Sequence, residues 1–321
     1  MSDKACMSID GNTKLLAVVG DPIEHTFSPY IHQILIEATG DNFAYVPFHI
    51  TKERLLQGIH GAWALGIQGI NVTIPHKQLV REALYRIDPE AQLVGAVNTL
   101  RWTESGYEGY NTDVTGFRKL LQLNQIPLKD QAVLIIGAGG AARSALTSCL
   151  VEGAAKIGVY NRTRERAQDM IDKFVVRAQK YGAYPIPPIS SISEEELYKG
   201  EYSVVLQTTS VGMYPNVDGI PVDDPHFFDQ VCHVADMVFN PESTKFVNMA
   251  RERGIPAVGG LSMLFYQGAK SYEIWTQRQF SEGELETMHE KFLGEEAFSL
   301  WPVTSYWWVS WGVVSRRLED G

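Results

Sequence analysis

The sequence predicts an α/β fold of two domains, with a mixed sheet in the first domain and a parallel sheet in the second. The main observation is that two blocks of alternating strand-like and helix-like segments meet near residues 115–129. A second observation is a glycine-rich turn that opens the later block, directly after an apolar run. The length of 321 residues suits two domains, each with its own hydrophobic core.

The first domain is predicted over residues 13–114 and has three strand candidates. They are LLAVVG (15–20), FAYVPF (43–48) and INVTI (70–74), with helical runs between them. In the third candidate, Ile70, Val72 and Ile74 share one face of an extended chain. Such alternation is typical of a strand that packs one face into a core. Pro75 then ends the strand, because proline has no N–H to donate to a sheet.

Lys77 follows this strand at an unusual position. Apolar residues at 79, 80, 83, 84 and 87 have helical spacing, so Lys77 is predicted to lie in the first turn of a helix. A cation there faces the positive end of the helix dipole, which disfavours it. The position therefore needs a functional explanation.

The second domain is predicted over residues 115–261 and begins with a nucleotide-binding pattern. Residues 133–146 read as an apolar strand, a glycine turn and a helix, and Gly137, Gly139 and Ala142 have the G-x-G-x-x-A spacing. The first glycine permits the tight turn, the second permits close approach of a pyrophosphate, and the alanine permits close packing of helix on strand. A Rossmann-type domain is expected, although the turn alone could be a tight strand–helix connection. Further strand candidates lie at 156–162, 202–209 and 233–239.

The end of the next strand indicates which dinucleotide binds. An NAD site usually has Asp or Glu there, for the ribose 2′-hydroxyl. This chain instead has Arg162 and Thr163, followed by Arg164 and Arg166. A guanidinium group suits a 2′-phosphate, so NADP is favoured over NAD. The alternative is a solvated basic start of a helix.

Four polar segments of the first domain lie where strands or helices begin or end. They are 25–29 (HTFSP), 71–77 (NVTIPHK), 95–100 (GAVNTL) and 109–117 (GYNTDVTGF). Together they could line one cleft with hydroxyl, amide, lysine and carboxylate groups, which suits a small polyhydroxylated anion. Singly, Thr26, Ser28 and Asp113 could each be a helix cap.

These motifs together resemble the shikimate dehydrogenase family over about residues 15–294. The segments 207–213 (QTTSVGM), 235–241 (ADMVFNP) and 259–269 (GGLSMLFYQGA) extend the resemblance. It implies a reversible NADPH-dependent reduction of 3-dehydroshikimate to shikimate, in the shikimate pathway that leads to chorismate and the aromatic amino acids. It also implies that helices of about residues 262–294 complete the first domain.

The resemblance assigns a role to each candidate residue. Lys77 and Asp113 are the catalytic pair: the lysine exchanges a proton with the reacting oxygen, and the aspartate orients it. The substrate-binding residues it implies are Thr26, Ser28, Thr73, Asn98, Asp113, Phe239 and Gln267. The cofactor-binding residues it implies are Gly137, Ala138, Gly139, Gly140, Ala141, Asn161, Arg162, Thr163, Arg166, Met237 and Gly260.

Two departures from the family pattern affect the expected substrate. The family most often has S-x-S-P where this chain has Thr26 to Pro29, and often has tyrosine where this chain has Phe239. Both positions are expected near the substrate carboxylate. A shikimate/quinate dehydrogenase of broader substrate use therefore stays open. A catalytically idle NADP(H)-binding regulator is a further alternative, but the presence of both Lys77 and Asp113 argues against it.

The composition indicates which other partners and which cellular compartment to expect. The net charge of −10 argues against nucleic acid or an anionic membrane as a partner. Three scattered cysteines, Cys6, Cys149 and Cys232, favour a reducing cytoplasm. The histidines have no ligand spacing, so no metal site is expected. The sequence leaves the oligomeric state open, a homodimer included.

The C-terminal residues 298–321 differ from the rest of the chain. They contain four of the seven tryptophans within an apolar run that also contains Pro, Ser and Thr. This run is shorter than the roughly 20 apolar residues of a membrane span, so no span is expected. An appendage outside the fold is the favoured interpretation, and an oligomer or membrane-surface contact is the alternative.

Overall fold

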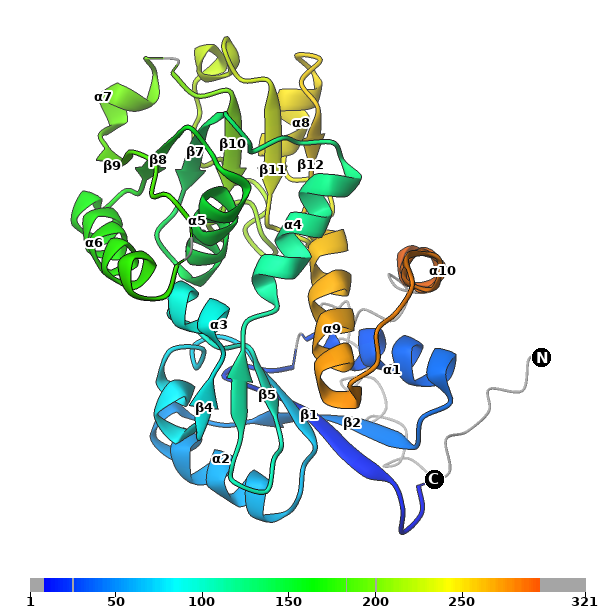
Figure 1. Ribbon diagram of the computed structural model, residues 1–321. Coiled ribbons are helices and arrows are strands. Elements are labelled where there is room, and N and C mark those ends of the chain that lie inside the picture. The colour runs from blue at the N-terminus through cyan, green and yellow to red at the C-terminus, as the bar shows by residue number, and fades with distance from the viewer. Residues whose placement is uncertain (1–8, 25, 183, 200, 295–321) are drawn as a thin grey trace, which may run out of the picture.

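The computed structural model describes residues 9–24, 26–182, 184–199 and 201–294. In these residues the chain forms two six-stranded sheets, one mixed and one parallel, which confirms the predicted fold class. Figure 1 shows the sheets at opposite ends of the molecule, with α4 (Asp113–Leu123) and α9 (Leu261–Thr276) side by side between them. The prediction for the tail at 298–321 lies outside the described residues.

The first sheet has the order β2-β1-β3-β5-β6-β4. Its strands are β1 (Lys14–Gly20), β2 (Phe43–His49), β3 (Gly69–Val72), β4 (Arg86–Ile87), β5 (Thr99–Arg101) and β6 (Glu108–Tyr110). β1 pairs in parallel with β2 and β3, while β5 pairs antiparallel with β3 and β6. Its helices are α1 (Ser28–Thr39), α2 (Leu55–Ala64) and α3 (Pro89–Val94), with short 3₁₀ helices η1 (Lys52–Arg54) and η2 (Leu79–Ala83).

The third strand differs from its prediction in length and in burial. β3 ends at Val72, and Ile74 is 73% exposed in the turn that follows. Ile70 and Val72 pack with Leu55 and other residues of the α2 side. Asn71, on the opposite face, is also buried, because α9 covers it there and Ser271 of α9 bonds to its side chain. Helices therefore cover both faces of this strand, where one solvent-facing side was expected.

The predicted helix at Lys77 is wrong. Residues 74–78 form a turn, η2 continues for only five residues, and Leu84 is already extended with ψ of 137°. The apolar spacing that suggested a longer helix is divided between η2 and β4, and α3 begins only after the Asp88 cap. The Lys77 carbonyl accepts a 2.8 Å bond from Val97 N–H, which ties the turn to the segment before Asn98.

The second sheet has the order β12-β11-β10-β7-β8-β9, with every pairing parallel. Its strands are β7 (Ala132–Ile136), β8 (Lys156–Tyr160), β9 (Ile189–Ile192), β10 (Val204–Gln207), β11 (His233–Asp236) and β12 (Ala257–Val258). This is the Rossmann strand order, in which the chain reverses direction across the sheet between β7 and β10. The associated helices are α5 (Gly140–Glu152), α6 (Arg164–Tyr181), α7 (Glu194–Leu197), α8 (Lys245–Arg251) and the 3₁₀ helix η3 (Pro225–Phe228).

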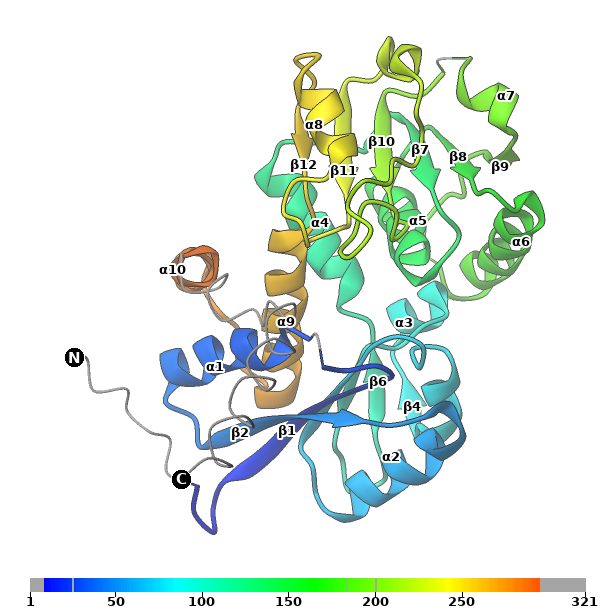
Figure 2. The ribbon, with the colours of Figure 1, turned by 180° about the vertical axis from the view of Figure 1, so that it is seen from behind.

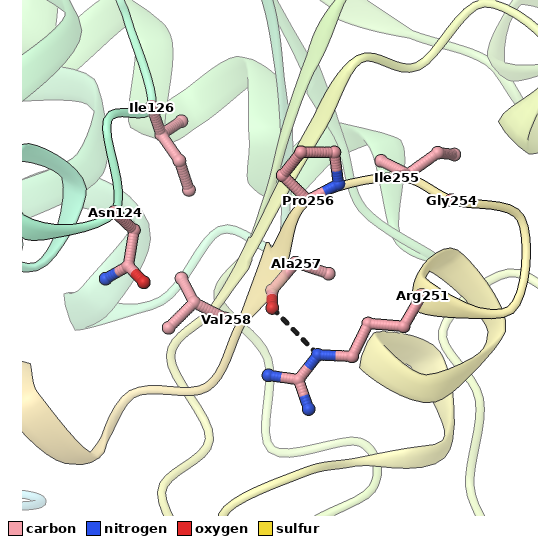
Figure 3. A pocket seen from close by; sticks show the side chains of 8 residues that line it. All are labelled: Asn124, Ile126, Arg251, Gly254, Ile255, Pro256, Ala257 and Val258. Carbon is pink, nitrogen blue, oxygen red and sulfur yellow. Dashed lines mark hydrogen bonds between the residues drawn. The ribbon is translucent and has the colours of Figure 1, made fainter.

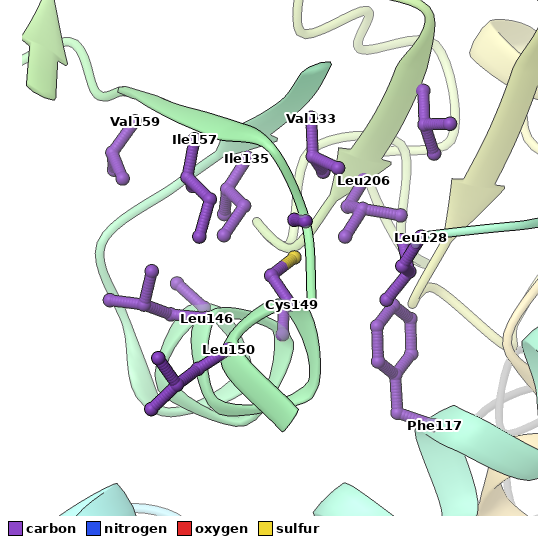
Figure 4. Packing of buried hydrophobic residues seen from close by; sticks show 14 of the residues in the cluster. Phe117, Leu128, Val133, Ile135, Leu146, Cys149, Leu150, Ile157, Val159 and Leu206 are labelled. Carbon is purple, nitrogen blue, oxygen red and sulfur yellow. The ribbon is translucent and has the colours of Figure 1, made fainter. Parts of the chain in front are cut away.

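Alternate residues of the central strand β7 supply the two cores of this domain. Val133 and Ile135 pack with Leu146 and Cys149 of α5 and with Phe117 of α4, as Figure 4 shows. Leu134 and Ile136 belong to the core that contains α8. The first core includes residues of both α4 and α5, so α4, which connects the two sheets, packs against the parallel sheet.

The joint between α4 and α9 is close because Gly116 has no side chain. A Cβ at Gly116 would lie 2.6 Å from the carbonyl oxygen of Met263 in α9. α10 (Glu282–Leu293) completes the described chain and packs with α1 and α9, as the rear view in Figure 2 shows. No helix among the described residues is long and apolar enough to cross a bilayer.

Candidate functional site

Lys77 and Asp113 form an ion pair although they are far apart in sequence. Lys77 Nζ lies 2.7 Å from Asp113 Oδ2. The lysine comes from the turn after β3, and the aspartate is the first residue of α4, three residues after β6 ends. Asp113 is 8% exposed and Lys77 is half-buried, so the pair is only partly accessible to solvent. The predicted catalytic residues are therefore together in one partly desolvated place.

Asn98 holds the other oxygen of the aspartate. Its Nδ2 donates to Asp113 Oδ1 at 2.9 Å, while its Oδ1 accepts from the backbone N–H of Thr112 at 2.8 Å. Because a backbone N–H can only donate, this second bond fixes which end of the amide faces Asp113. Gln267 Oε1, on α9, lies 3.3 Å from Asn98 Nδ2. Four predicted site residues from four segments thus converge.

Thr26 and Ser28 lie at the start of α1, where their hydroxyl oxygens are 3.1 Å apart. The N-cap position is Phe27, but the Thr26 hydroxyl accepts the backbone N–H of Ser28 at 3.3 Å, so Thr26 keeps part of the capping role that the sequence left open. The Phe27 and Phe239 rings meet edge to face at 6.0 Å between centroids. Phe239, which follows β11, therefore lies beside the Thr26–Ser28 segment.

Thr73 directly follows β3 and is half-buried. Its backbone is fixed by bonds to Val19 and His76, and its methyl group lies over Gly20. The Thr73 hydroxyl has no hydrogen-bond partner among the described residues. It is thus available to a ligand.

The glycine turn after β7 has the geometry that a pyrophosphate requires. Gly137 has φ of +119°, and a Cβ there would lie 2.6 Å from Thr208 Oγ1, so glycine is needed. A Cβ at Gly139 or at Gly140 would meet no described atom within 4 Å. This space adjoins the first turn of α5, which begins at Gly140 and presents free backbone N–H groups. The turn fits a dinucleotide phosphate.

The arginines after β8 divide into two kinds. Arg164 Nη2 donates to the Ser191 carbonyl at 3.1 Å, so this arginine holds β9 against α6. Arg162 and Arg166 are exposed and have no ion pair or side-chain hydrogen bond with any described residue. Asn161 Nδ2 donates to the Thr163 carbonyl at 2.8 Å and shapes the turn between them. Two free guanidinium groups therefore stand at the predicted 2′-phosphate position.

Met237 and Gly260 lie against each other, on the loop after β11 and at the cap of α9. A Cβ at Gly260 would lie 2.5 Å from the Met237 carbonyl oxygen, and Gly260 N–H donates to the Val238 carbonyl at 2.8 Å. Buried Asp236 holds this loop: its Oδ1 accepts from Val238 N–H at 2.9 Å, and its Oδ2 accepts from the Thr244 hydroxyl at 2.7 Å. Burial raises the pKa of Asp236 to about 6.

A set of polar residues lies behind the site and received no individual role from the sequence, although Asn71, Thr99 and Thr112 belong to the polar segments expected to line the cleft. They are His32, Tyr45, Asn71, Thr99, Thr112 and Ser271, and they bond to one another and to Asn98. The only sequence signal was a polar residue at an inward position of a strand, as at Asn71. Such a residue also suits a strand with one solvent face, so the pattern alone could not identify it.

A surface pocket lies elsewhere, at the edge strand β12. It is lined by Arg251 and residues 254–258, together with Asn124 and Ile126 after α4 (Figure 3). Arg251 Nε already donates to the Ala257 carbonyl at 3.0 Å. None of the residues that line this pocket belongs to the predicted site. Among the described residues, no three His, Cys, Asp or Glu side chains gather as metal ligands, and the absence of a metal stays a prediction.

Models of three protein-family domains match consecutive parts of the chain. The shikimate dehydrogenase substrate-binding domain matches residues 18–100, shikimate/quinate 5-dehydrogenase matches 119–196, and the shikimate 5′-dehydrogenase C-terminal domain matches 260–285. The shikimate dehydrogenase (NADP(+)) of Methanopyrus kandleri is 36% identical over 89% of this chain and 97% of that protein. The enzyme of the same name from Geobacter sp. (strain M21) is 39% identical over 87% of this chain and 96% of that protein.

Solved structures agree with these matches. A chorismate mutase/shikimate 5-dehydrogenase fusion protein from Clostridium acetobutylicum superposes with a TM-score of 0.80 at 32% identity, over 90% of this chain and 99% of that one. Shikimate 5-dehydrogenase from Thermus thermophilus, in complex with NADP(H) and shikimate, gives a TM-score of 0.75 at 29% identity, over 88% of this chain and 100% of that one.

Proposed function

The chain belongs to the shikimate dehydrogenase family, and we propose that it catalyses the reversible NADPH-dependent reduction of 3-dehydroshikimate to shikimate. The single observation that carries the mechanism is the 2.7 Å contact between Lys77 Nζ and Asp113 Oδ2. In the proposed organisation, residues 13–114 and about 262–294 bind substrate, and residues 115–261 bind the cofactor.

Reduction of a ketone needs a proton at the oxygen that becomes the hydroxyl group. The ion pair with Asp113 presents Lys77 as an ammonium group, which can donate that proton, and in the reverse reaction the amine takes the proton back. Asp113 holds the lysine in place, and Asn98 fixes the aspartate through its other oxygen. When bound, NADP(H) supplies or accepts the hydride.

The polar side chains predicted to contact the substrate support its choice. Thr26 and Ser28 offer two hydroxyls at a helix start to the substrate carboxylate. The Thr73 hydroxyl has no hydrogen-bond partner among the described residues, and the amides of Asn98 and Gln267, which contact each other at 3.3 Å, are the groups proposed to bind the ring hydroxyls. This set suits a small anion with several hydroxyl groups.

The cofactor residues follow the same logic. Residues 137–141 would hold the pyrophosphate, with Met237 and Gly260 lining the cofactor site at the start of α9. Asn161 would shape the adenosine end, where Arg162, Thr163 and Arg166 would bind the 2′-phosphate. The guanidinium groups of Arg162 and Arg166 are exposed and have no partner in the part of the chain that the structure describes, and they support NADP over NAD because a phosphate dianion can pair with them.

The exact substrate, the location and the oligomeric state remain predictions. Quinate is the second candidate substrate, because Thr26 and Phe239 change the predicted carboxylate pocket. A cytoplasmic location is supported by the scattered cysteines, one of which (Cys149) is buried. The sequence leaves the oligomeric state open, and a homodimer stays a prediction. The idle-regulator alternative is disfavoured by the Lys77–Asp113 pair, since binding alone does not require it.

Steady-state kinetics with shikimate and quinate, each with NADP and NAD, test the proposal. We expect the highest kcat/KM for shikimate with NADP. Turnover of neither acid by the purified full chain would refute the function. A higher kcat/KM for quinate would establish the broader or alternative substrate, and a higher kcat/KM with NAD would refute the assignment of Arg162 and Arg166.

A further inference from the structure

A continuous chain of buried hydrogen bonds joins α9 to the catalytic aspartate. Ser271 Oγ, fully buried on α9, lies 2.7 Å from Thr99 Oγ1 and 3.0 Å from Asn71 Nδ2. The Thr99 hydroxyl donates in turn to Asn98 Oδ1 at 3.0 Å. Asn98 then donates to Asp113, the partner of Lys77. Ser271 is thus three hydrogen bonds from the carboxylate.

The direction of these bonds follows from counting protons. Asn98 Oδ1 is an acceptor, because it receives the backbone N–H of Thr112. Thr99 has one hydroxyl proton and uses it on that oxygen. The 2.7 Å contact between Ser271 and Thr99 therefore needs the proton of Ser271. Ser271 therefore has one proton for two acceptors, Thr99 Oγ1 at 2.7 Å and the Gln267 carbonyl at 3.0 Å, and its oxygen accepts from the amide nitrogen of Asn71.

The direction of the hydrogen bonds at Asn71 can be assigned in the same way. Asn71 Oδ1 accepts from Tyr45 Oη at 2.7 Å and from His32 Nε2 at 3.0 Å. Burial lowers the pKa of His32 to about 3, so the ring is neutral and its Nε2 carries the proton that it donates. The route from Asn71 through Ser271 and Thr99 to Asn98 is thus aligned toward Asp113, although the Ser271 proton is shared with the Gln267 carbonyl. Bonds aligned in one direction in a dry interior strengthen one another.

We propose that Ser271 is a positioning residue for the proton transfer between Lys77 and the substrate oxygen. Its hydroxyl links the amide of Asn71 to the hydroxyl of Thr99 and so holds Asn98 against Asp113. The proposal rests on the function proposed above. Ser271 also lies one helical turn after Gln267, and its hydroxyl is 3.0 Å from the Gln267 carbonyl. The same side chain therefore also contacts the turn of α9 that carries Gln267, a residue proposed to bind substrate.

The test compares Ser271→Ala and Ser271→Cys with a matched control, Ser148→Ala. Ser148 is also a fully buried helical serine, but its hydroxyl donates only to the Ser144 carbonyl at 2.9 Å, within α5. We expect Ser271→Ala to lower kcat about five- to tenfold with the KM for NADP unchanged, because one lost buried hydrogen bond has that size. Ser271→Cys, a weaker donor of similar shape, should be intermediate. Ser148→Ala should keep the wild-type kcat.

A second readout separates positioning from general loss of stability. The solvent deuterium isotope effect on kcat should rise in Ser271→Ala, because a misplaced Lys77 makes the proton transfer more rate-limiting. Wild-type kcat in Ser271→Ala, or an equal loss in Ser148→Ala, would overturn the positioning role. A wild-type enzyme that does not turn over shikimate would overturn the proposed function and this role with it.

Discussion

Asp236 gives a prediction whose size can be worked from the structure. Its carboxyl group is fully buried at the end of β11, and burial raises its pKa from 3.8 to about 6 despite hydrogen bonds from Val238, Thr244 and Gln207. In the unfolded chain the pKa returns to its ordinary value. Between these two values the folded protein holds a proton that the unfolded chain has released.

The sign of the pH effect follows from this difference. The stability that the Asp236 proton contributes is fully present below pH 3.8 and is lost as the pH rises through about 6. At about 1.4 kcal/mol for each pKa unit, the whole loss is about 3 kcal/mol. Lowering the pH from 7 to 5 recovers about 1 kcal/mol of it.

Urea unfolding of the wild type and of Asp236→Asn at pH 7 and pH 5 measures this contribution. The unfolding free energy of the wild type should rise by about 1 kcal/mol relative to that of the variant when the pH falls, because the amide does not titrate. All other groups titrate equally in both proteins and cancel. Asp172→Asn, at an exposed position on α6, is the control and should follow the wild type. A pH response of Asp236→Asn equal to that of the wild type would refute the reasoning.

Three further predictions concern the cofactor, the substrate and the joint between the domains. Arg162→Ala should raise the KM for NADP at least tenfold and leave the KM for NAD unchanged in steady-state assays, since only NADP has the phosphate; equal losses would mean a structural role. Phe239→Tyr should lower the KM for shikimate about tenfold with kcat unchanged, because a new donor to a carboxylate is worth about 1.5–3 kcal/mol, and an unchanged or higher KM would contradict this. Gly116→Ala should lower the unfolding free energy, measured by urea unfolding, by about 1–3 kcal/mol, because its Cβ would lie 2.6 Å from the Met263 carbonyl oxygen. Gly283→Ala, on α10, is the control and should not destabilise the protein, because a Cβ there meets no described atom within 4 Å.

The parallel sheet could be predicted from the sequence because its strands are buried on both faces. In the sequence such strands are short continuous apolar runs, as in β7 and β10. The glycine turn after β7 marks where that strand ends and the next helix begins. The edge strands β9 and β12 were not predicted. β9 contains two serines and β12 has only two residues, so neither has the apolar run that marks a central strand.

The candidate site was less accessible to sequence reasoning. The Lys77–Asp113 pair was assigned only through the family resemblance, because nothing local indicates that two residues 36 positions apart will meet. Ser271 was missed for the same physical reason: its partner Thr99 is 172 residues away, and a serine inside a helix carries no signal of its own. Local patterns determine which segments are buried, whereas the pairing of polar groups depends on how distant segments pack.

The measurement that tests the central claim most directly is the turnover of Lys77→Ala with shikimate and NADP at neutral pH, alongside NADP binding to the same variant. Removal of one acid–base group should lower kcat at least ~10²-fold. The dissociation constant for NADP should stay unchanged, because Lys77 lies in the first domain and the glycine turn in the second. Lys52→Ala, an exposed lysine of η1, is the control and should keep wild-type turnover. A Lys77→Ala enzyme that retains more than about half of wild-type kcat would contradict the assignment of Lys77 as the proton donor.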